Sequence, residues 1–284
     1  MTSKRIQITA DSVCDLPDSV LSDLNIKIIP TYVNIGDKSI PDDGVQLVRE
    51  DFYKQLPDMP SQPTTAAPSP GDAEAFFKNL LPDADHIISF HVPAKLSGVY
   101  NAMRLGAEAV DPEKITLVDS LQLTMGIGMQ VWVAAELAQE TDDVDEILKA
   151  VERVRLNTQL YAIIDTMEYL KRSGRVNSMI ASLGSFLKIK PIVTVWEGDI
   201  LSHARVRTWS RAEDKLRDLT HEQAPLDRLA VLHIANRSGA EKFLDSIRDI
   251  APEKTVIMEV TPTLGTHIGP GSVGVVTLST NWRQ

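Results

Sequence analysis

Short apolar segments alternate with amphipathic segments along the first 165 residues, and this alternation constrains the fold more than any single motif. Apolar runs bounded by turn residues are typical of strands, and apolar positions three or four apart are typical of helices. Their alternation predicts a parallel sheet covered by helices. Strands are expected at residues 5–10, 26–33, 86–92, 115–118 and 160–164, and helices at about 15–24, 45–56, 73–80, 97–109, 125–138 and 144–156.

The second half of the chain has a different pattern, and we place the boundary near Asp165. A turn at Gly198 between two apolar runs indicates a hairpin, so mixed strand directions are expected there. The predicted fold class is α/β with two lobes: a parallel-sheet lobe over residues 1–165 and a mixed-sheet lobe over residues 166–284. The second lobe has expected helices at 166–170, 212–221 and 240–250, an amphipathic segment at 178–187, and strands at 191–196, 205–208, 229–234, 255–260 and 273–279.

Charge and cysteine content exclude some classes of protein. The formal net charge of -10 and the pI near 5.1 argue against nucleic-acid binding, because contacts to phosphates require concentrated Lys and Arg. Cys14 is the single cysteine, and no export signal or transmembrane segment of roughly 20 apolar residues is recognisable. We therefore expect a cytoplasmic protein.

Near the C-terminus, Gly269, Gly271 and Gly274 satisfy the pattern G-x-G-x-x-G. In a dinucleotide-binding protein this pattern opens a helix and precedes an acidic residue by about 20 positions. Here it leads into β-branched residues that predict a strand. We expect a glycine-supported loop that presents His267, and a tight turn between two strands is the alternative.

Residues 57–70 contain five prolines, which exclude a helix and predict a long extended loop. Long ordered loops often carry binding residues, so a binding loop around Thr64 and Thr65 is favoured over a solvated linker.

Motifs of several enzyme classes are missing from the sequence. There is no H-E-x-x-H, paired C-x-x-C, Walker A or G-x-S-x-G motif. His86 and His91 are an odd number of positions apart on a predicted strand and should face opposite sides. We expect no metal site, with a cluster of distant carboxylates as the less favoured alternative.

Polar residues gather at the ends of the predicted strands. Ser97 follows one of these strands and opens a helix, where its hydroxyl can cap the helix or help to bind an anion. In a parallel sheet such strand ends lie along one edge, where open α/β folds bind ligands. The set comprises Asp11, Ser12, Thr65, Ser97, Asp119, Ser120 and His267.

Several motifs, in the same order, resemble the DegV family over essentially the whole chain. That family comprises fatty-acid-binding subunits that work with a dihydroxyacetone-kinase-like partner in bacterial fatty acid kinase. The motifs that carry the resemblance are Asp11 and Ser12, residues 96–100 (LSGVY), 118–120, 170–176 (LKRSGRV), 187–192 and 265–274.

The resemblance implies a long-chain fatty acid buried in a tunnel between the lobes, and no cofactor. Thr65, Ser97 and His267 match the family's carboxylate-binding residues, and residues 178–187 fall where the family has an apolar tunnel wall. The matching positions around the site are Asp11, Ser12, Gly98, Ser120, Gly269 and Gly271.

The resemblance also implies that a separate kinase brings ATP and phosphorylates the bound fatty acid. The basic residues expected to meet this kinase are Lys171, Arg172, Arg175, Arg205 and Arg207, for which a solvated surface is the alternative. Transient contact with a membrane surface is a further expectation.

The chain departs from the family at four positions near the expected carboxylate. Ala66 and Ala67 replace polar residues of the family's T-S-Q-P-S loop, and Pro93 and Ala94 replace a serine pair. These changes remove hydrogen-bond donors, so head-group affinity or chain preference is expected to differ.

The sequence leaves open whether the chain is itself an enzyme. In the second hypothesis it acts on a small anionic substrate, with His267 as a base or covalent acceptor near Asp11 or Asp119. A third, an adaptor role, is opposed by the acidic charge. We expect a monomer; acyl length and unsaturation depend on cavity shape, which periodicity does not fix.

Overall fold

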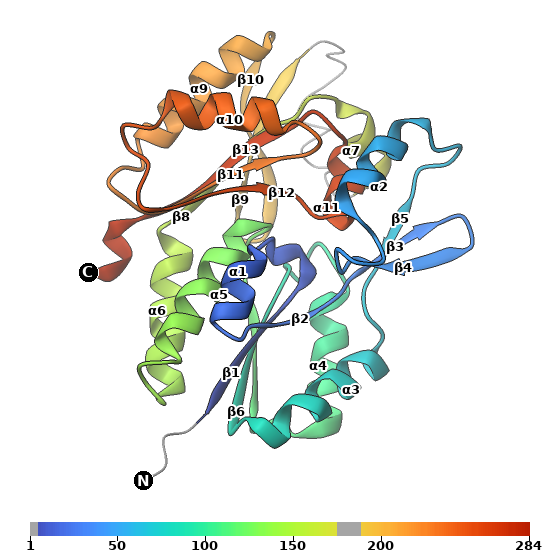
Figure 1. The fold of residues 1–284 in the computed structure, drawn as a ribbon, viewed down its shortest axis with the longest axis vertical. Coiled ribbons are helices and arrows are strands. Elements are labelled where there is room, and N and C mark those ends of the chain that lie inside the picture. Colours follow the sequence, from blue (N-terminus) through green and yellow to red (C-terminus); the bar gives the residue numbers. More distant parts are fainter. Residues whose placement is uncertain (1–4, 175–188) are drawn as a thin grey trace.

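A computed structural model describes residues 5–174 and 189–284, which form two α/β lobes (Figure 1). The elements of the first lobe are β1 (Ile6–Asp11), α1 (Asp18–Asp23), β2 (Lys27–Ile29), β3 (Tyr32–Ile35), β4 (Lys38–Pro41), α2 (Arg49–Gln55), β5 (Thr64–Ala66), α3 (Pro70–Leu80), β6 (His86–His91), α4 (Val99–Val110), β7 (Ile115–Asp119), α5 (Met125–Leu137) and α6 (Val144–Leu156).

The first lobe is built on the parallel sheet that the alternating pattern predicts. Its strand order is β2-β1-β6-β7, and all its strand pairs are parallel. The carboxyl ends of β1, β6 and β7 therefore lie at one edge, where Asp11, His91 and Asp119 occur.

The predicted strand at residues 26–33 is two strands that belong to different sheets. β2 joins the parallel sheet, whereas β3 pairs with β4 and β5 in a small antiparallel sheet. Pro30 lies between them and has no N–H to donate, so it interrupts the ladder. The proline-rich segment is thus not wholly a loop, because Thr65 in β5 is paired with Val33.

The second lobe contains a mixed six-stranded sheet with the order β10-β9-β8-β13-β11-β12. β8 pairs antiparallel with β9 and β13, so the change of sheet occurs before Thr158 rather than near Asp165. The elements are β8 (Thr158–Ile163), α7 (Met167–Ser173), β9 (Lys190–Trp196), β10 (Asp199–Val206), α9 (Trp209–His221), β11 (Leu226–His233), α10 (Arg237–Ser246), β12 (Lys254–Glu259), α11 (Pro262–Ile268) and β13 (Val273–Ser279).

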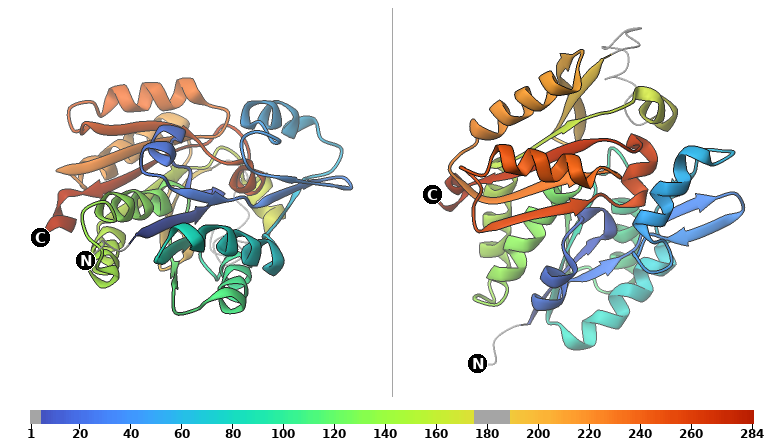
Figure 2. Two further views of the ribbon diagram at one scale, coloured as in Figure 1. Left: turned by 60° about the horizontal axis from the view of Figure 1, so that its bottom comes forward. Right: turned by 45° about the horizontal axis from the view of Figure 1, so that its top comes forward.

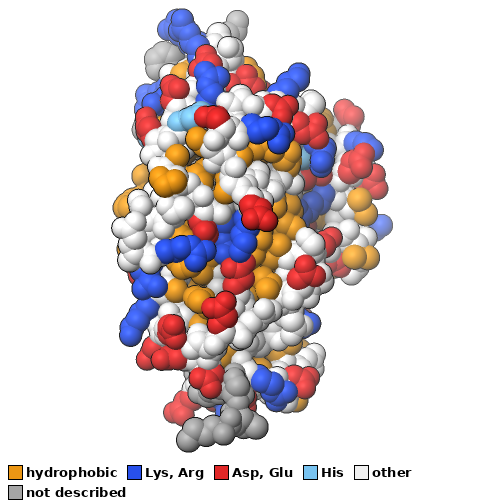
Figure 3. Space-filling model, turned by 60° about the vertical axis from the view of Figure 1, so that its left-hand side comes forward, with side chains coloured by type: hydrophobic (Ala, Val, Ile, Leu, Met, Phe, Trp, Pro, Cys, Tyr) orange, Lys and Arg blue, Asp and Glu red, His pale blue; other side chains and the backbone are white. Residues whose placement is uncertain are grey.

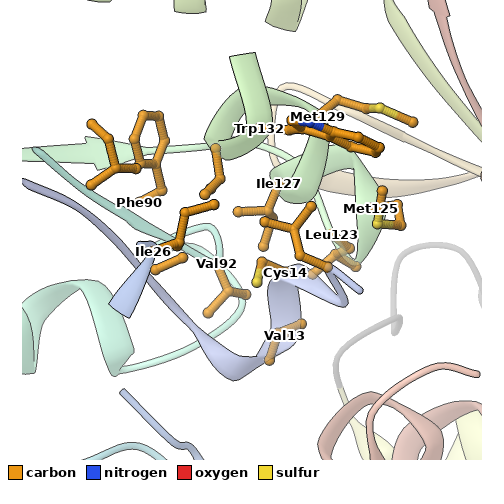
Figure 4. Packing of buried hydrophobic residues seen from close by; sticks show 14 of the residues in the cluster. Val13, Cys14, Ile26, Phe90, Val92, Leu123, Met125, Ile127, Met129 and Trp132 are labelled. Carbon is orange, nitrogen blue, oxygen red and sulfur yellow. The ribbon is translucent and has the colours of Figure 1, made fainter. Parts of the chain in front are cut away.

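Helix α5 lies between the two sheets, while α9 and α10 cover the outer face of the second sheet (Figures 1 and 2). The residues of α5 from Met125 to Ala135 are all buried, as expected for a helix that is apolar all round. Gly128 faces the backbone oxygen of Cys14, where a Cβ would come within 2.7 Å. The packing of α5 against Val13, Cys14 and Phe90 appears in Figure 4.

A buried carboxylate joins the two lobes. Asp15 Oδ1 accepts a hydrogen bond from the backbone N–H of Thr261 at 2.9 Å and lies 3.3 Å from Arg49 Nη1. Its Oδ2 accepts a bond of 2.7 Å from the hydroxyl of Thr124. Burial raises the pKa of Asp15 to about 6, although Arg49 and these donors favour the charged form.

Asp15 should make the stability of the fold depend on pH. The pKa of Asp15 is about 6 in the folded protein and near 3.8 as a free side chain. The folded state therefore binds the proton more tightly, so protonation of Asp15 stabilises the fold below about pH 4, and this stabilisation is lost as the pH rises to about 6. At about 1.4 kcal/mol per tenfold change in proton affinity, the upper limit of this contribution to the free energy of unfolding is about 3 kcal/mol. Asp15→Asn should gain stability relative to the wild type over this range, as measured by denaturant unfolding.

A suitable control for that comparison is Asp23→Asn, which changes an exposed carboxylate at the end of α1. If the difference in free energy of unfolding between wild type and Asp15→Asn stayed constant from about pH 4 to about pH 6, the raised pKa of Asp15 would be contradicted.

Cys14 should be inert in the folded protein. It is 2% exposed, and burial raises the pKa of its thiol to about 12, so little reactive thiolate forms near neutral pH. We expect no reaction with a disulfide reagent under native conditions and one equivalent in guanidinium chloride. Rapid native labelling would show that the packing around α5 opens.

Candidate functional site

A cavity of about 510 Å³ lies between the two lobes, within the size range of small-molecule sites. One wall is the inner face of the second sheet, where Leu160 and Ala162 of β8 lie beside Val193 and Val195 of β9. Alternate residues of a strand share a face, which explains this apolar wall. The first lobe contributes Val13, Val92, Leu96 and Leu123 among others.

Thr65 and His267 meet at the wall of this cavity. Thr65 Oγ1 lies 2.9 Å from His267 Nε2, although the residues are 202 positions apart. The predicted loop position of His267 is wrong, because this residue lies in the last turn of α11. Pro262 in the first turn is compatible with a helix start, and Gly269, with φ of 82°, ends the helix.

Ser97 also lines the cavity, just before α4. Its Oγ accepts a bond of 3.3 Å from the backbone N–H of Val99. Ser97 therefore bonds to the helix start, although α4 begins two residues later than expected. A hydroxyl that accepts such a bond still carries a hydrogen that it can donate to a ligand.

The four departures from the DegV pattern are close to these residues. Ala66, Ala67 and Ala94 line the cavity beside Thr65 and Ser97. The carbonyl of Pro93 accepts hydrogen bonds from Leu96 N and Ser97 N. The alanines present methyl groups where polar side chains would offer donors.

Asp11 and Ser120 contact the segment that precedes Ser97 and are not among the described residues that line the cavity. Asp11 Oδ2 accepts a bond of 2.9 Å from Val92 N and lies 3.3 Å from His91 Nδ1. The Ser120 hydroxyl donates to the carbonyl of His91 at 2.7 Å. A fully buried carboxylate requires such partners, and here they fix the loop that precedes Ser97.

Two glycines of the dinucleotide-like pattern shape the turn after α11, while Gly274 lines the cavity. Gly269 and Gly271 have positive φ in the turn from α11 to β13, and neither lines the cavity within the described part of the chain. A Cβ on Gly269 would come within 2.2 Å of the ring of Tyr169. A strand follows this turn, as predicted, so the helix of a dinucleotide-binding motif is replaced by β13.

Sequence reasoning missed the polar contacts that hold α11 in place. Thr31 Oγ1 lies 2.9 Å from Ser12 Oγ and 2.7 Å from Thr263 Oγ1, and both threonines line the cavity. The Thr263 N–H donates to Asp42 Oδ2 at 2.7 Å. Burial raises the pKa of Asp42. Thr31 lies inside the strand predicted at residues 26–33, so that pattern gave no signal of this contact.

Two further residues fix the ends of α11. The Tyr53 hydroxyl donates to the carbonyls of Val260 and Thr261, and a Cβ on Gly265 would come within 2.0 Å of that hydroxyl. Gln62 Nε2 donates to the carbonyl of Thr266 at 3.0 Å. These contacts set the position of His267 relative to Thr65.

The basic residues lie at one end of the second sheet. Lys171 and Arg172 are exposed in the last turn of α7, and Arg205 and Arg207 are exposed at the end of β10. Arg205 lies opposite Pro191 in the sheet. The carbonyl of Pro191 accepts a hydrogen bond from the N–H of Ile164, which lies between β8 and α7. Arg175 and residues 178–187 lie outside the described residues.

On the face in Figure 3, Lys and Arg side chains are interspersed with Asp and Glu. Among residues 5–174 and 189–284, no cluster of three His, Cys, Asp or Glu side chains could hold a metal. No helix in the same described ranges is long and apolar enough to cross a bilayer.

A family model and several known proteins match this chain over nearly its whole length. The family model described as "Uncharacterised protein, DegV family" matches residues 5–280. A DegV domain-containing protein of Streptomyces coelicolor is 32% identical, covering 98% of this chain and 99% of the relative. A Listeria monocytogenes protein of the same description is 29% identical, covering 96% of this chain and 98% of the relative.

Solved structures of similar proteins share the fold. A DegV family protein from Thermus thermophilus, described as fatty acid binding, is 28% identical with a TM-score of 0.89, covering 97% of this chain and 99% of its own. DegV of Bacillus subtilis, described as a fatty acid binding protein, is 26% identical with a TM-score of 0.88, covering 97% and 100%. The match of family model, relatives and fold over nearly the full length identifies this chain as a member of the DegV family.

Proposed function

We propose that this protein binds one long-chain fatty acid and presents its carboxylate to a separate ATP-dependent kinase, which forms an acyl phosphate. The observation that carries the proposal is an apolar cavity that has Thr65, Ser97 and His267 in its wall. Similar solved proteins from Thermus thermophilus and Bacillus subtilis are described as fatty acid binding, which supports the same ligand here.

The apolar part of the cavity accounts for affinity. Burying about sixteen methylene groups at about 0.8 kcal/mol each gives an upper estimate of about 13 kcal/mol before ordering costs. Side chains such as Leu160, Val195 and Leu232 provide the apolar surroundings that this burial requires. The acyl chain can therefore dominate binding, and the head group needs few contacts.

The polar residues suit a carboxylate. Hydroxyl and imidazole groups can donate hydrogen bonds to its oxygens. Such donors neutralise the carboxylate less than a bidentate arginine would, so an oxygen keeps more of its nucleophilic character. This balance fits a ligand that must react while it is bound.

ATP is assigned to a partner of the dihydroxyacetone-kinase-like class. The chain lacks a Walker A motif, and its G-x-G-x-x-G pattern leads into β13. We assign docking of the kinase to the exposed basic residues at the α7 and β10 end of the second sheet, to which the sequence adds Arg175.

The competing hypothesis, an enzyme with His267 assisted by Asp11 or Asp119, has less support. The carboxylate of Asp11 accepts from Val92 N and Val13 N. That of Asp119 accepts from Ala94 N and Leu121 N. Both carboxylates are thus used to fix loops of the first lobe.

Native mass spectrometry of the purified protein, repeated after denaturation, should detect one fatty acid per chain. Thr65→Val with Ser97→Ala should weaken retention by about a hundredfold or more, since each of the two hydrogen bonds to a charged group contributes about 1.5–3 kcal/mol. Thr255→Val with Ser246→Ala is the matched control, because these hydroxyls bond to backbone carbonyls outside the cavity. Unaltered retention in the first variant would remove Thr65 and Ser97 from head-group binding.

Charge reversal at Arg205 and Arg207 should separate docking from ligand binding. We expect acyl phosphate formation with the partner kinase to fall at least tenfold, because complementary charges speed and orient association. Fatty acid retention should stay within twofold of wild type. Arg217→Glu on α9 is the control, and an emptied cavity in the double variant would instead indicate a structural role.

A further inference from the structure

Four completely buried polar side chains form a hydrogen-bonded chain in the first sheet. Thr9 and Asp11 lie on β1, and Ser89 and His91 lie on the neighbouring strand β6. Alternate residues of a strand share a face, and Thr9 is in register with Ser89, so the four side chains meet. Burial of polar groups is costly unless they are paired, and here they pair with one another.

The hydrogen bonds of this chain run in one direction. The hydroxyl of Thr9 donates to Ser89 Oγ at 2.6 Å, which leaves the hydrogen of Ser89 for His91 Nε2 at 2.8 Å. Because Nε2 accepts, the neutral imidazole carries its hydrogen on Nδ1, which lies 3.3 Å from Asp11 Oδ2. The chain therefore ends at a carboxylate, and His91 is the group that donates to it.

A serine, a histidine and an aspartate in this order also form the triad of serine hydrolases. Here the serine is completely buried and has no route to a substrate. None of the four side chains is among the described residues that line the main cavity, or a smaller cavity of about 150 Å³ that shares Thr65 and His267 with it. An effect of this chain on a ligand therefore has to pass through other residues.

Asp11 connects the chain to the wall of the main cavity. Its Oδ1 accepts a hydrogen bond of 3.0 Å from the N–H of Val13, and its Oδ2 accepts one of 2.9 Å from the N–H of Val92. Both valines line the cavity and are labelled in Figure 4. The orientation of one carboxylate thus sets two positions in the cavity wall.

The segment after Val92 transmits this position to Ser97. The ring of Pro93 fixes its φ, and the carbonyl of Pro93 accepts hydrogen bonds from Leu96 N at 2.9 Å and Ser97 N at 3.2 Å. The N–H of Ala94 donates to a carboxylate of the first lobe at 3.2 Å. Residues 92–97 are therefore a closed turn, and a shift of Val92 is passed on to the hydroxyl of Ser97.

We propose that His91 is a positioning residue for the head-group site, which acts through Asp11 and the turn at residues 92–97. This inference rests on the proposed function, in which Ser97 donates to the carboxylate of the fatty acid. Pro93 and Ala94 leave this turn without the serine hydroxyls of the family's pattern, so few donors remain. Hydrogen bonds weaken steeply with distance and angle, and the placement of Ser97 therefore decides how well the carboxylate is recognised.

The first measurement tests the chain of hydrogen bonds without a ligand. Two-bond proton–nitrogen correlation spectra of the protein labelled with nitrogen-15 histidine report which ring nitrogen carries the hydrogen. The signals of His91 are identified by their loss in His91→Asn. We expect the Nδ1–H tautomer for His91 at neutral pH. A hydrogen on Nε2 would reverse the chain and overturn the proposal.

The second measurement compares hexadecanoate with hexadecan-1-ol, which share an acyl chain length and differ in head group. The ratio of their dissociation constants gives the preference for a carboxylate. His91→Leu removes both ring nitrogens, whereas His91→Asn keeps an N–H donor on Cγ that can reach Asp11. Ser89→Ala removes one hydroxyl of the chain. Its control is Ser279→Ala, which also changes a buried serine, one that bonds to the carbonyl of Pro225 outside the cavity.

We expect His91→Leu to lower the preference for hexadecanoate at least fivefold, with hexadecan-1-ol binding within twofold of wild type, and His91→Asn to recover part of the loss. Ser89→Ala should lower the preference at least twofold, and it tests the same chain if His91→Leu does not fold. Ser279→Ala should leave the preference unchanged.

An unchanged preference in Ser89→Ala and His91→Leu would overturn the positioning role and leave the proposed function standing. An equal loss of affinity for both ligands would do the same, because it would show that His91 only stabilises the fold. A wild-type protein that binds neither ligand, or binds both equally well, would instead overturn the proposed function itself.

Discussion

The buried carboxylate of Asp15 joins the lobes, and the site depends on this junction. It accepts a hydrogen bond from Thr261 N, immediately before α11, while Arg49 and the Thr124 hydroxyl balance its charge. A buried carboxylate that loses such partners is costly, so the partners are held in place. Residues of the second lobe are thereby anchored to the first, and the cavity between the lobes keeps its shape.

The anchoring explains how Thr65 and His267, which are 202 positions apart in the sequence, come within 2.9 Å of each other. His267 is positioned by α11, and α11 is held by Tyr53 and Asp42 from the first lobe. Thr65 is positioned by the pairing of β5 with β3. The cavity therefore has an apolar wall from the second sheet and a polar pair, Thr65 and His267, to which each lobe contributes one residue. In the proposed function, the wall holds the acyl chain and the pair holds the reacting end.

Local patterns predicted most of the fold. The parallel first sheet and the mixed second sheet follow from alternation and turn signals that act over a few residues. The errors occur where distant segments compete for a strand. Residues 26–33 divide at Pro30 because β5 offers β3 a second partner, and β8 joins the second sheet because β9 and β13 flank it.

The sequence by itself determined the family, the α/β class and the identity of Thr65, Ser97 and His267 as candidate residues, because motifs and periodicity are local properties of the chain. The tertiary structure decided that Thr65 and His267 touch and that His267 lies on a helix. It also decided that two cavities meet at this pair. These features depend on how two sheets pack around α5, and side chains far apart in sequence become neighbours through that packing alone.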